Sequence, residues 1–188
     1  MTYSKWRNPP AVLEGGIVRA QVLNQALQTD LSLSVHRLAH KTADESVPSS
    51  TTLQDDDHLF FTVGVNELWF IHLHMFYVCA TSSVGIKLGF SHPTDADARL
   101  QAYAMNENEI DFIIRNYTTD SPGFISSSNW RTQTANNALS VRGMLFTVSE
   151  GTFRVRWAQA TSAANPVIVR ANSSIQGVKV GPNPQVAT

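Results

Sequence analysis

Charged residues are scarce in this sequence. Only 15% of its 188 residues are charged, against about 25% in a typical soluble domain, whereas 43% are hydrophobic. A chain with so much apolar surface and so little charge collapses instead of staying disordered. Its surface must be covered by Ser, Thr, Asn and Gln. This profile is typical of a packed β protein whose neutral polar faces are buried again in an assembly.

An excess of basic residues is also missing. The 14 Lys and Arg and the 15 Asp and Glu give a formal net charge of −1 at pH 7, and the basic residues do not form a local cluster. The electrostatic attraction that draws proteins to phosphate backbones therefore has no source. We expect no nucleic acid partner, and instead another protein or a sugar.

The sequence contains one cysteine, Cys79, which excludes an internal disulfide framework. It lies in the apolar run Leu68–Ala80, where we interpret it as a small buried hydrophobe and not as a reactive thiol. No apolar run reaches the roughly 20 residues that a membrane-spanning helix needs. The N-terminal residues also lack the apolar core of a signal peptide. We expect a protein made in a cytoplasm, placed by assembly, with no membrane partner.

The motifs of common enzyme classes are absent as well. The sequence has no nucleophile elbow, no P-loop, no glycine-rich dinucleotide turn and no metalloprotease helix. Asp95 and Asp97, near His92, stand in a loop-like stretch, and nothing places a nucleophile beside them. We expect a non-enzymatic protein with no catalytic residue, no cofactor and no metal.

The N-terminal segment 1–32 is predicted to be an anchoring arm. Proline and glycine pairs make its first half extended. Apolar residues at helical spacing then predict a short amphipathic helix from about Ile17 to Asp30. A helix this short is marginal in water on its own, so its apolar stripe must dock on the following domain, on a sister copy or on a larger assembly. The candidate anchoring residues are Trp6, Pro9, Ile17, Val18, Leu23 and Leu27.

Residues 33–181 show the two-residue period of β-strands. The polar stretch Lys41–Asp57 is predicted to be loop, and residues 182–188 an extended tail. Gly151, after Ser149 and Glu150, predicts a tight hairpin. Strands are predicted at Leu59–Val65, Glu67–Ala80, Val84–Ser91, Glu109–Tyr117, Leu139–Val148, Thr152–Ala160, Val167–Ala171 and Ser174–Val180. Roughly eight such strands predict an antiparallel β-sandwich or jelly roll.

Three groups of residues are candidates for binding. His72 and His74 lie two apart in a predicted strand, so both imidazoles face one side and could share a metal. With no third ligand at a suitable spacing, a polar sheet face in contact with a ligand or a sister subunit is the preferred interpretation. Trp130, in a predicted loop, could stack on a sugar or pack at a subunit contact. The run Asp55–Asp57 lacks the alternating oxygens and glycine of calcium loops, so we interpret it as a solvated turn leading into a strand.

Two regions of the sequence resemble small virion proteins of tailed bacteriophages. The first region has a Trp-x-x-Pro segment, a glycine and a short helix with Leu-Asn, and it comprises Trp6–Pro10, Gly16–Asn24 and Thr29–Leu31. The second is more specific and comprises Lys41–Val47, Ser49–Asp57 and Leu59–Val63. Farther along, Ile86–Phe90 contains Lys-x-x-Phe and Trp157–Ser162 contains Trp-Ala-Gln-x-Thr-Ser, as in those proteins. Between Asp95 and Asn137 no resemblance is found.

The resemblance implies a virion component and no catalytic residues. We expect a capsid decoration or head-fibre protein, assembled in the host bacterial cytoplasm as a homotrimer. Its arm would bind the major capsid protein or another virion protein. The alternatives are a minor tail or tail-fibre component and a carbohydrate-binding module that recognises a host-surface glycan.

Overall fold

The computed structural model describes residues 35–79, 81, 83–106, 109–118, 125–126 and 137–185. The chain divides into two units after Val35, and all the described strands belong to the second unit. Within the described residues there are twelve strands and no helix. In this part of the chain no helix could cross a membrane. The predicted arm 1–32 and its helix lie outside the described residues, so both stay predictions.

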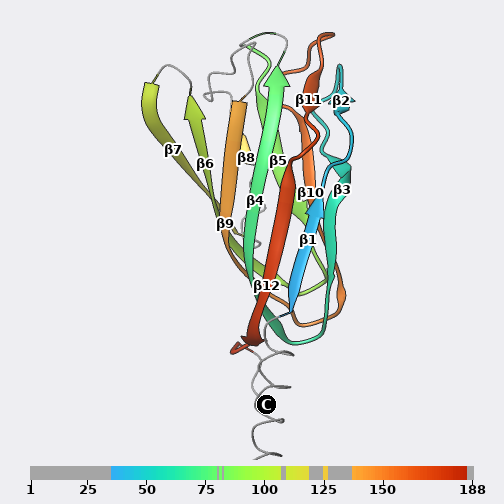
Figure 1. Ribbon diagram of the computed structural model, residues 1–188, viewed down its shortest axis with the longest axis vertical. Coiled ribbons are helices and arrows are strands. Elements are labelled where there is room, and N and C mark those ends of the chain that lie inside the picture. Colours follow the sequence, from blue (N-terminus) through green and yellow to red (C-terminus); the bar gives the residue numbers. More distant parts are fainter. Residues whose placement is uncertain are drawn as a thin grey trace, which may run out of the picture. The chain divides into compact units, whose positions relative to one another are not determined.

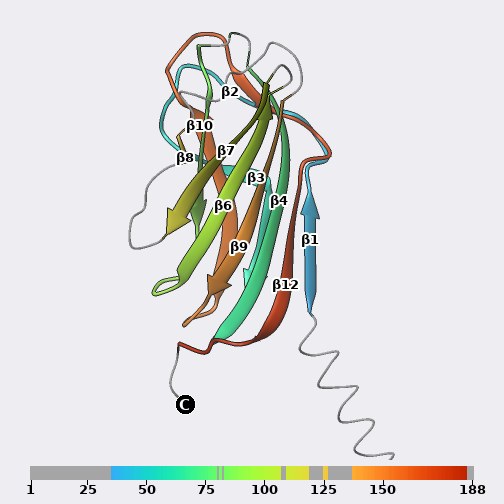
Figure 2. The same cartoon turned by 90° about the vertical axis from the view of Figure 1, so that its left-hand side faces the viewer.

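The strands form two antiparallel sheets (Figures 1 and 2). The main path of the larger sheet is β1 (His36–His40), β12 (Ser174–Pro182), β4 (Glu67–Cys79), β9 (Asn137–Phe146), β6 (Asp97–Asn106) and β7 (Glu109–Thr118). At one end, β11 (Val167–Val169) pairs with β4 and with β2 (Glu45–Val47). The smaller sheet is ordered β3 (Gln54–Val63), β10 (Gly151–Gln159), β5 (Ile86–Ser91) and β8 (Ile125–Ser126). The prediction of a mainly β, antiparallel fold is therefore confirmed.

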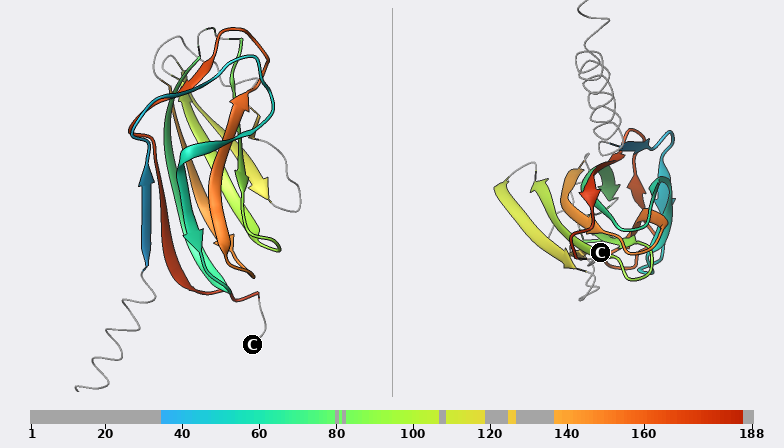
Figure 3. Two further views of the ribbon diagram at one scale, coloured as in Figure 1. Left: turned by 90° about the vertical axis from the view of Figure 1, so that its right-hand side faces the viewer. Right: turned by 90° about the horizontal axis from the view of Figure 1, so that it is seen from below.

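From β3 to β10 the chain winds back and forth between the sheets (Figure 3). The sequence-adjacent strands β6 and β7 pair with each other, whereas the other connections in this stretch lead from one sheet to the other. The predicted hairpin at Gly151 is wrong for this reason. The two strands that it was predicted to join, β9 and β10, belong to different sheets, and β10 pairs with β3 and β5. Alternation of apolar and polar residues shows that a strand has an apolar face, but it does not determine which strand pairs with it.

The core lies between the two sheets. Every second residue of β4 from Trp69 to Cys79 is buried, as the period of a strand with one apolar face requires. The ring of Phe61, on β3, lies 5.6 Å from the Trp69 ring and 5.7 Å from the Phe153 ring, centroid to centroid. Aromatic contacts therefore join the smaller sheet to the larger. Cys79 is fully buried, in agreement with its interpretation as a small core residue.

All the predicted strands are present, with ends shifted by a few residues, but others were missed. The strand β6 was not predicted because its buried residues include Ala98, Ala102 and Ala104, whose short side chains give a weak hydrophobic pattern. The stretch Lys41–Asp57 was predicted to be loop, yet it contains β2 and the start of β3. In this stretch polar side chains make the contacts with the interior, so a search for alternating apolar residues could not detect these strands.

Candidate functional site

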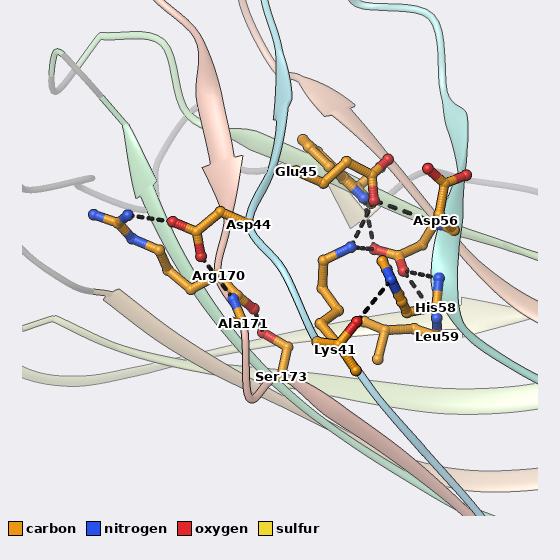
Figure 4. A network of polar contacts seen from close by, with 12 residues as sticks. Lys41, Asp44, Glu45, Asp56, His58, Leu59, Arg170, Ala171 and Ser173 are labelled. Atoms are coloured by element: carbon orange, nitrogen blue, oxygen red, sulfur yellow. Dashed lines mark hydrogen bonds and ion pairs between the residues drawn. The ribbon is translucent and has the colours of Figure 1, made fainter.

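A buried carboxylate, Asp56, stands at the centre of a polar cluster (Figure 4). A register shift turns this side chain inward. Phe60 of β3 pairs with Arg154 and Asp55 pairs with Arg156, so the residues from Asp56 to Leu59 lie opposite Val155 alone. At this bulge Asp56 Oδ1 accepts hydrogen bonds from the backbone N–H groups of His58 (2.9 Å) and Leu59 (2.8 Å). One carboxylate oxygen is thus held by two amide donors.

The second oxygen of Asp56 faces a lysine. Lys41 Nζ lies 2.8 Å from Asp56 Oδ2, and both side chains are 0% exposed. Trp157 Nε1 donates to the same oxygen at 3.0 Å. Lys41 Nζ also lies 2.5 Å from Oε2 of Glu45, whose side chain is 20% exposed. One ammonium group therefore sits between two carboxylates inside the fold.

Backbone contacts fix the position of Lys41 against the turn that precedes β12. Its N–H donates to Ser173 O at 2.8 Å, and its carbonyl accepts from Asn172 N at 2.9 Å. Beside it, Asp44 Oδ2 pairs with Arg170 Nη1 at 2.6 Å and Asp44 Oδ1 accepts from Ala171 N at 2.8 Å. The Ala171 N–H and the Arg170 guanidinium hold the pKa of Asp44 below its ordinary value. The segment that carries Lys41 is thus held at both ends.

A histidine completes the cluster. His58 Nε2 lies 3.2 Å from Thr42 Oγ1, and His58 Nδ1 is buried without a hydrogen-bond partner. Glu45, Asp56 and His58 each offer one ligand atom, and these atoms lie within 4.8 Å of one another. Carboxylates and imidazole are ligands that zinc accepts. However, the Lys41 ammonium already contacts both carboxylates, so a metal ion would meet a like charge, and the residues do not fit one.

The prediction of a solvated turn at Asp55–Asp57 is therefore wrong. These residues lie within β3, and Asp56 is fully buried. The exposed neighbour Asp55 behaves differently, since its Oδ1 pairs with Arg156 Nε at 2.8 Å on the outer side of the sheet. The partner of Asp56 could not be found by local pattern, because Lys41 lies 15 residues earlier in a stretch without strand signals.

The predicted same-side placement of His72 and His74 is confirmed, because both are half-buried on the outer face of the larger sheet. His72 pairs in register with Gln176 and Arg142, and His74 with Ser174 and Ser140. His72 Nε2 lies 3.1 Å from Ser140 Oγ. Burial, with further effects from Arg142 and His74, lowers the pKa of His72. No group of metal-ligating side chains found among the described residues includes either histidine.

The same outer face carries an apolar row. Phe70 lies directly between Val178 of β12 and Met144 of β9, and its side chain is 40% exposed. On β1, Leu38 is 72% exposed and pairs with Gln176, one step along the face from Val178. Isolated exposed apolar residues are common, but adjoining ones mark surfaces for contact with other molecules. We call Leu38, Phe70, Met144 and Val178 the apolar row.

The other predicted site residues lie outside the described residues. These are Trp130 and the anchoring candidates Trp6, Pro9, Ile17, Val18, Leu23 and Leu27. Their roles stay predictions.

Comparison with known proteins finds no matching family model and no matching curated protein. Eiger TNF from S. frugiperda is similar over 82% of this chain and 99% of that chain, at 11% identity and a TM-score of 0.43. The infectious bursal disease virus Gx strain structure is similar over 80% of this chain, at 11% identity and a TM-score of 0.23. The VP2 subviral particle of that virus is similar over 81%, at 10% identity and a TM-score of 0.22. The chain spans 43% and 42% of those two viral chains. Similarities at this level assign neither a family nor an activity.

Proposed function

We propose that this chain is a structural component of a tailed-phage virion, a capsid decoration or head-fibre protein anchored through residues 1–32. The strand order is the observation that carries the proposal. Strands β3-β10-β5-β8 face β4-β9-β6-β7, and the chain passes between these two sets as in a jelly roll, an arrangement used by viral capsid domains and lectins. We therefore assign the fold to the jelly rolls.

The resemblance to phage virion proteins supports the same proposal. Its more specific segments, between Lys41 and Val63, supply Lys41, Glu45 and Asp56 of the buried cluster. These residues bind one another inside the fold, as expected of a segment with a structural role. The proposal gives the chain no external substrate and no cofactor.

The apolar row gives the proposal a contact surface. An outer sheet face with neighbouring apolar side chains suits burial against another protein. We propose that this face contacts sister copies in a homotrimer, which leaves the arm to bind the major capsid protein or another virion protein.

The first experiment is to measure the mass of the chain in solution, with and without residues 1–30, and its binding to empty expanded phage heads. We expect a trimer in both forms and loss of head binding when the arm is removed. A monomer in both forms would contradict the trimer, and unchanged head binding would contradict the anchoring arm. Labelling of the tail instead of the head on intact particles would favour the minor tail or tail-fibre alternative.

A carbohydrate-binding, receptor-recognition module is the second candidate, because lectins share the jelly roll. Such a module should keep its host glycan after deletion of residues 1–30 and lose it in Trp130→Ala. A decoration protein should show the opposite dependence, with head binding sensitive to the arm and indifferent to Trp130. Glycan and head binding measured on both variants separate the two.

A further inference from the structure

We propose that Lys41 and Asp56 react with each other to form an intramolecular amide bond between Lys41 Nζ and Asp56 Cγ, with Glu45 as the proton carrier. The reaction is a single self-modification of the folded chain. It goes beyond the virion role proposed above and does not depend on it.

The two reacting groups are already in contact. Lys41 Nζ lies 2.8 Å from Asp56 Oδ2, so the amine is held against the carboxyl group that it would attack. Such fixed placement turns a bimolecular reaction into a unimolecular one and replaces a large part of the entropy of approach. Both side chains are 0% exposed. Bulk water, which in solution opposes condensation of an amine with an acid, is therefore kept away from the pair.

The reaction requires the uncharged forms of both groups. A buried ion pair has lost the hydration of both its charges, and passing one proton from the ammonium to the carboxylate leaves a neutral amine and a neutral acid. Glu45 Oε2, 2.5 Å from Lys41 Nζ, is placed to take a proton from that nitrogen. Its side chain is partly exposed, and a carboxylate oxygen of Glu45 lies within 4.8 Å of one of Asp56, so a proton taken from Lys41 has a short way to the Asp56 carboxyl group.

The contacts of Asp56 suit each stage of the reaction. After the first proton transfer, the Lys41 amine attacks Asp56 Cγ and a C–N bond forms. Negative charge then develops on Oδ1, where the N–H groups of His58 and Leu59 (2.9 and 2.8 Å) act as an oxyanion hole. Glu45 carries the second proton from nitrogen to Oδ2, the C–Oδ2 bond breaks, and one water leaves. The amide keeps one N–H, and no oxidant or co-reactant is consumed.

Another lysine–carboxylate pair of the same length lacks this setting. Lys179 Nζ lies 2.8 Å from Glu67 Oε1, but those side chains are 24% and 15% exposed, so water reaches both. The Lys41–Asp56 bond would also have a mechanical use. Lys41 directly follows β1 of the larger sheet, whereas Asp56 belongs to β3 of the smaller sheet, so the amide would bind one sheet covalently to the other.

Mass spectrometry of the purified full chain tests the proposal. We expect an intact mass lower than that of the sequence by one water. Trypsin should fail to cut after Lys41, so the peptide Leu38–Lys87 should appear uncut, with a mass lower than that of its own sequence by one water. Cleavage after Lys179 in the same digest is the internal control. An intact mass equal to that of the sequence, with complete cleavage after Lys41, would overturn the proposal.

Two variants test the roles of the residues. Lys41→Arg keeps the positive charge but cannot form the amide, so its mass should equal that of its sequence. Any mass change caused by processing of the chain ends would also be present in this variant, which therefore controls for it. Glu45→Gln keeps the size of the side chain but cannot carry a proton, so it should fold with the circular dichroism of the wild type and remain unlinked. A linked Glu45→Gln protein would overturn the role of Glu45, and the wild-type mass decides on the bond itself even if a variant fails to fold.

Discussion

Individual residues of the buried cluster differ sharply in what they contribute. Asp56 satisfies a buried lysine, an indole and two backbone amides, whereas Asp55, one position earlier, is half exposed and pairs with arginines at the surface. Adjacent carboxylates of the same type thus have different surroundings, because the bulge in β3 turns one inward.

We predict that Asp56→Ala strongly destabilises the fold. It removes the carboxyl group that pairs with Lys41 and that is proposed to form the amide, and it leaves the Lys41 ammonium buried with Glu45 as its remaining acidic contact. Removing one partner of a buried ion pair typically costs about 3–5 kcal/mol, and loss of the amide would add to that cost. Asp55→Ala is the matched control and should change the free energy of unfolding by no more than about 1 kcal/mol, as for exposed pairs. Urea unfolding of both variants measures this. Equal effects of the two substitutions would contradict the assignment of Asp56 as the buried partner.

A second residue-scale prediction concerns pH. The pKa of His72 in the folded protein lies below its ordinary value of 6.5, mainly because of burial. The unfolded chain therefore takes up the proton first as pH falls, and the contribution of neutral His72 to stability, present above about pH 6.5, is lost below it. In His72→Gln the fall in stability between pH 8 and pH 5 should be smaller than in the wild type. Urea unfolding at both pH values tests this, and an identical fall in the two proteins would disprove it.

At the scale of elements, the close approach of two strands limits which residue can occupy a position between them. Gly143 of β9 has φ +158°, and a Cβ at this position would lie 2.0 Å from the carbonyl oxygen of Arg99 and 2.8 Å from Leu100 Cα. Both atoms belong to the backbone of β6. The pairing of β9 with β6 therefore requires glycine at position 143, because no side chain fits between the two strands there.

We predict that Gly143→Ala lowers the free energy of unfolding by about 1–3 kcal/mol or more, because β6 must move away from β9 or the backbone at position 143 must become strained. Gly181→Ala is the control, since a Cβ there has no neighbour within 4 Å. Thermal unfolding should show a lower midpoint for Gly143→Ala and a nearly unchanged one for Gly181→Ala. A tolerated alanine at 143 would mean that β9 and β6 pair less closely than described.

For the whole molecule, the proposed trimer uses the outer face of the larger sheet and leaves the outer face of the smaller sheet free. Phe70 lies on the outer face of the larger sheet, within the apolar row, and Phe60 on the outer face of the smaller sheet, with the Arg154 guanidinium 4.4 Å from its ring centroid. The two side chains are similarly exposed, at 40% and 37%. They therefore form a matched pair for locating a subunit interface.

We predict that Phe70→Ser lowers the oligomeric state and that Phe60→Ser leaves it unchanged, because only Phe70 belongs to the face proposed to contact sister copies. Mass measured by light scattering over a range of concentrations reads out the result, with circular dichroism as the check on folding. If Phe60→Ser dissociates the oligomer and Phe70→Ser does not, the interface lies on the smaller sheet.

The local pattern of the sequence was enough to predict the mainly β class, the strands with alternating apolar residues, the burial of Cys79 and the shared side of His72 and His74. Each of these depends on a two-residue period that neighbouring residues carry by themselves. The tertiary structure alone decided that β9 and β10 belong to different sheets and that Asp56 meets Lys41. Those contacts join residues whose partners are chosen by how the whole chain closes its core, and no short stretch of sequence contains that choice.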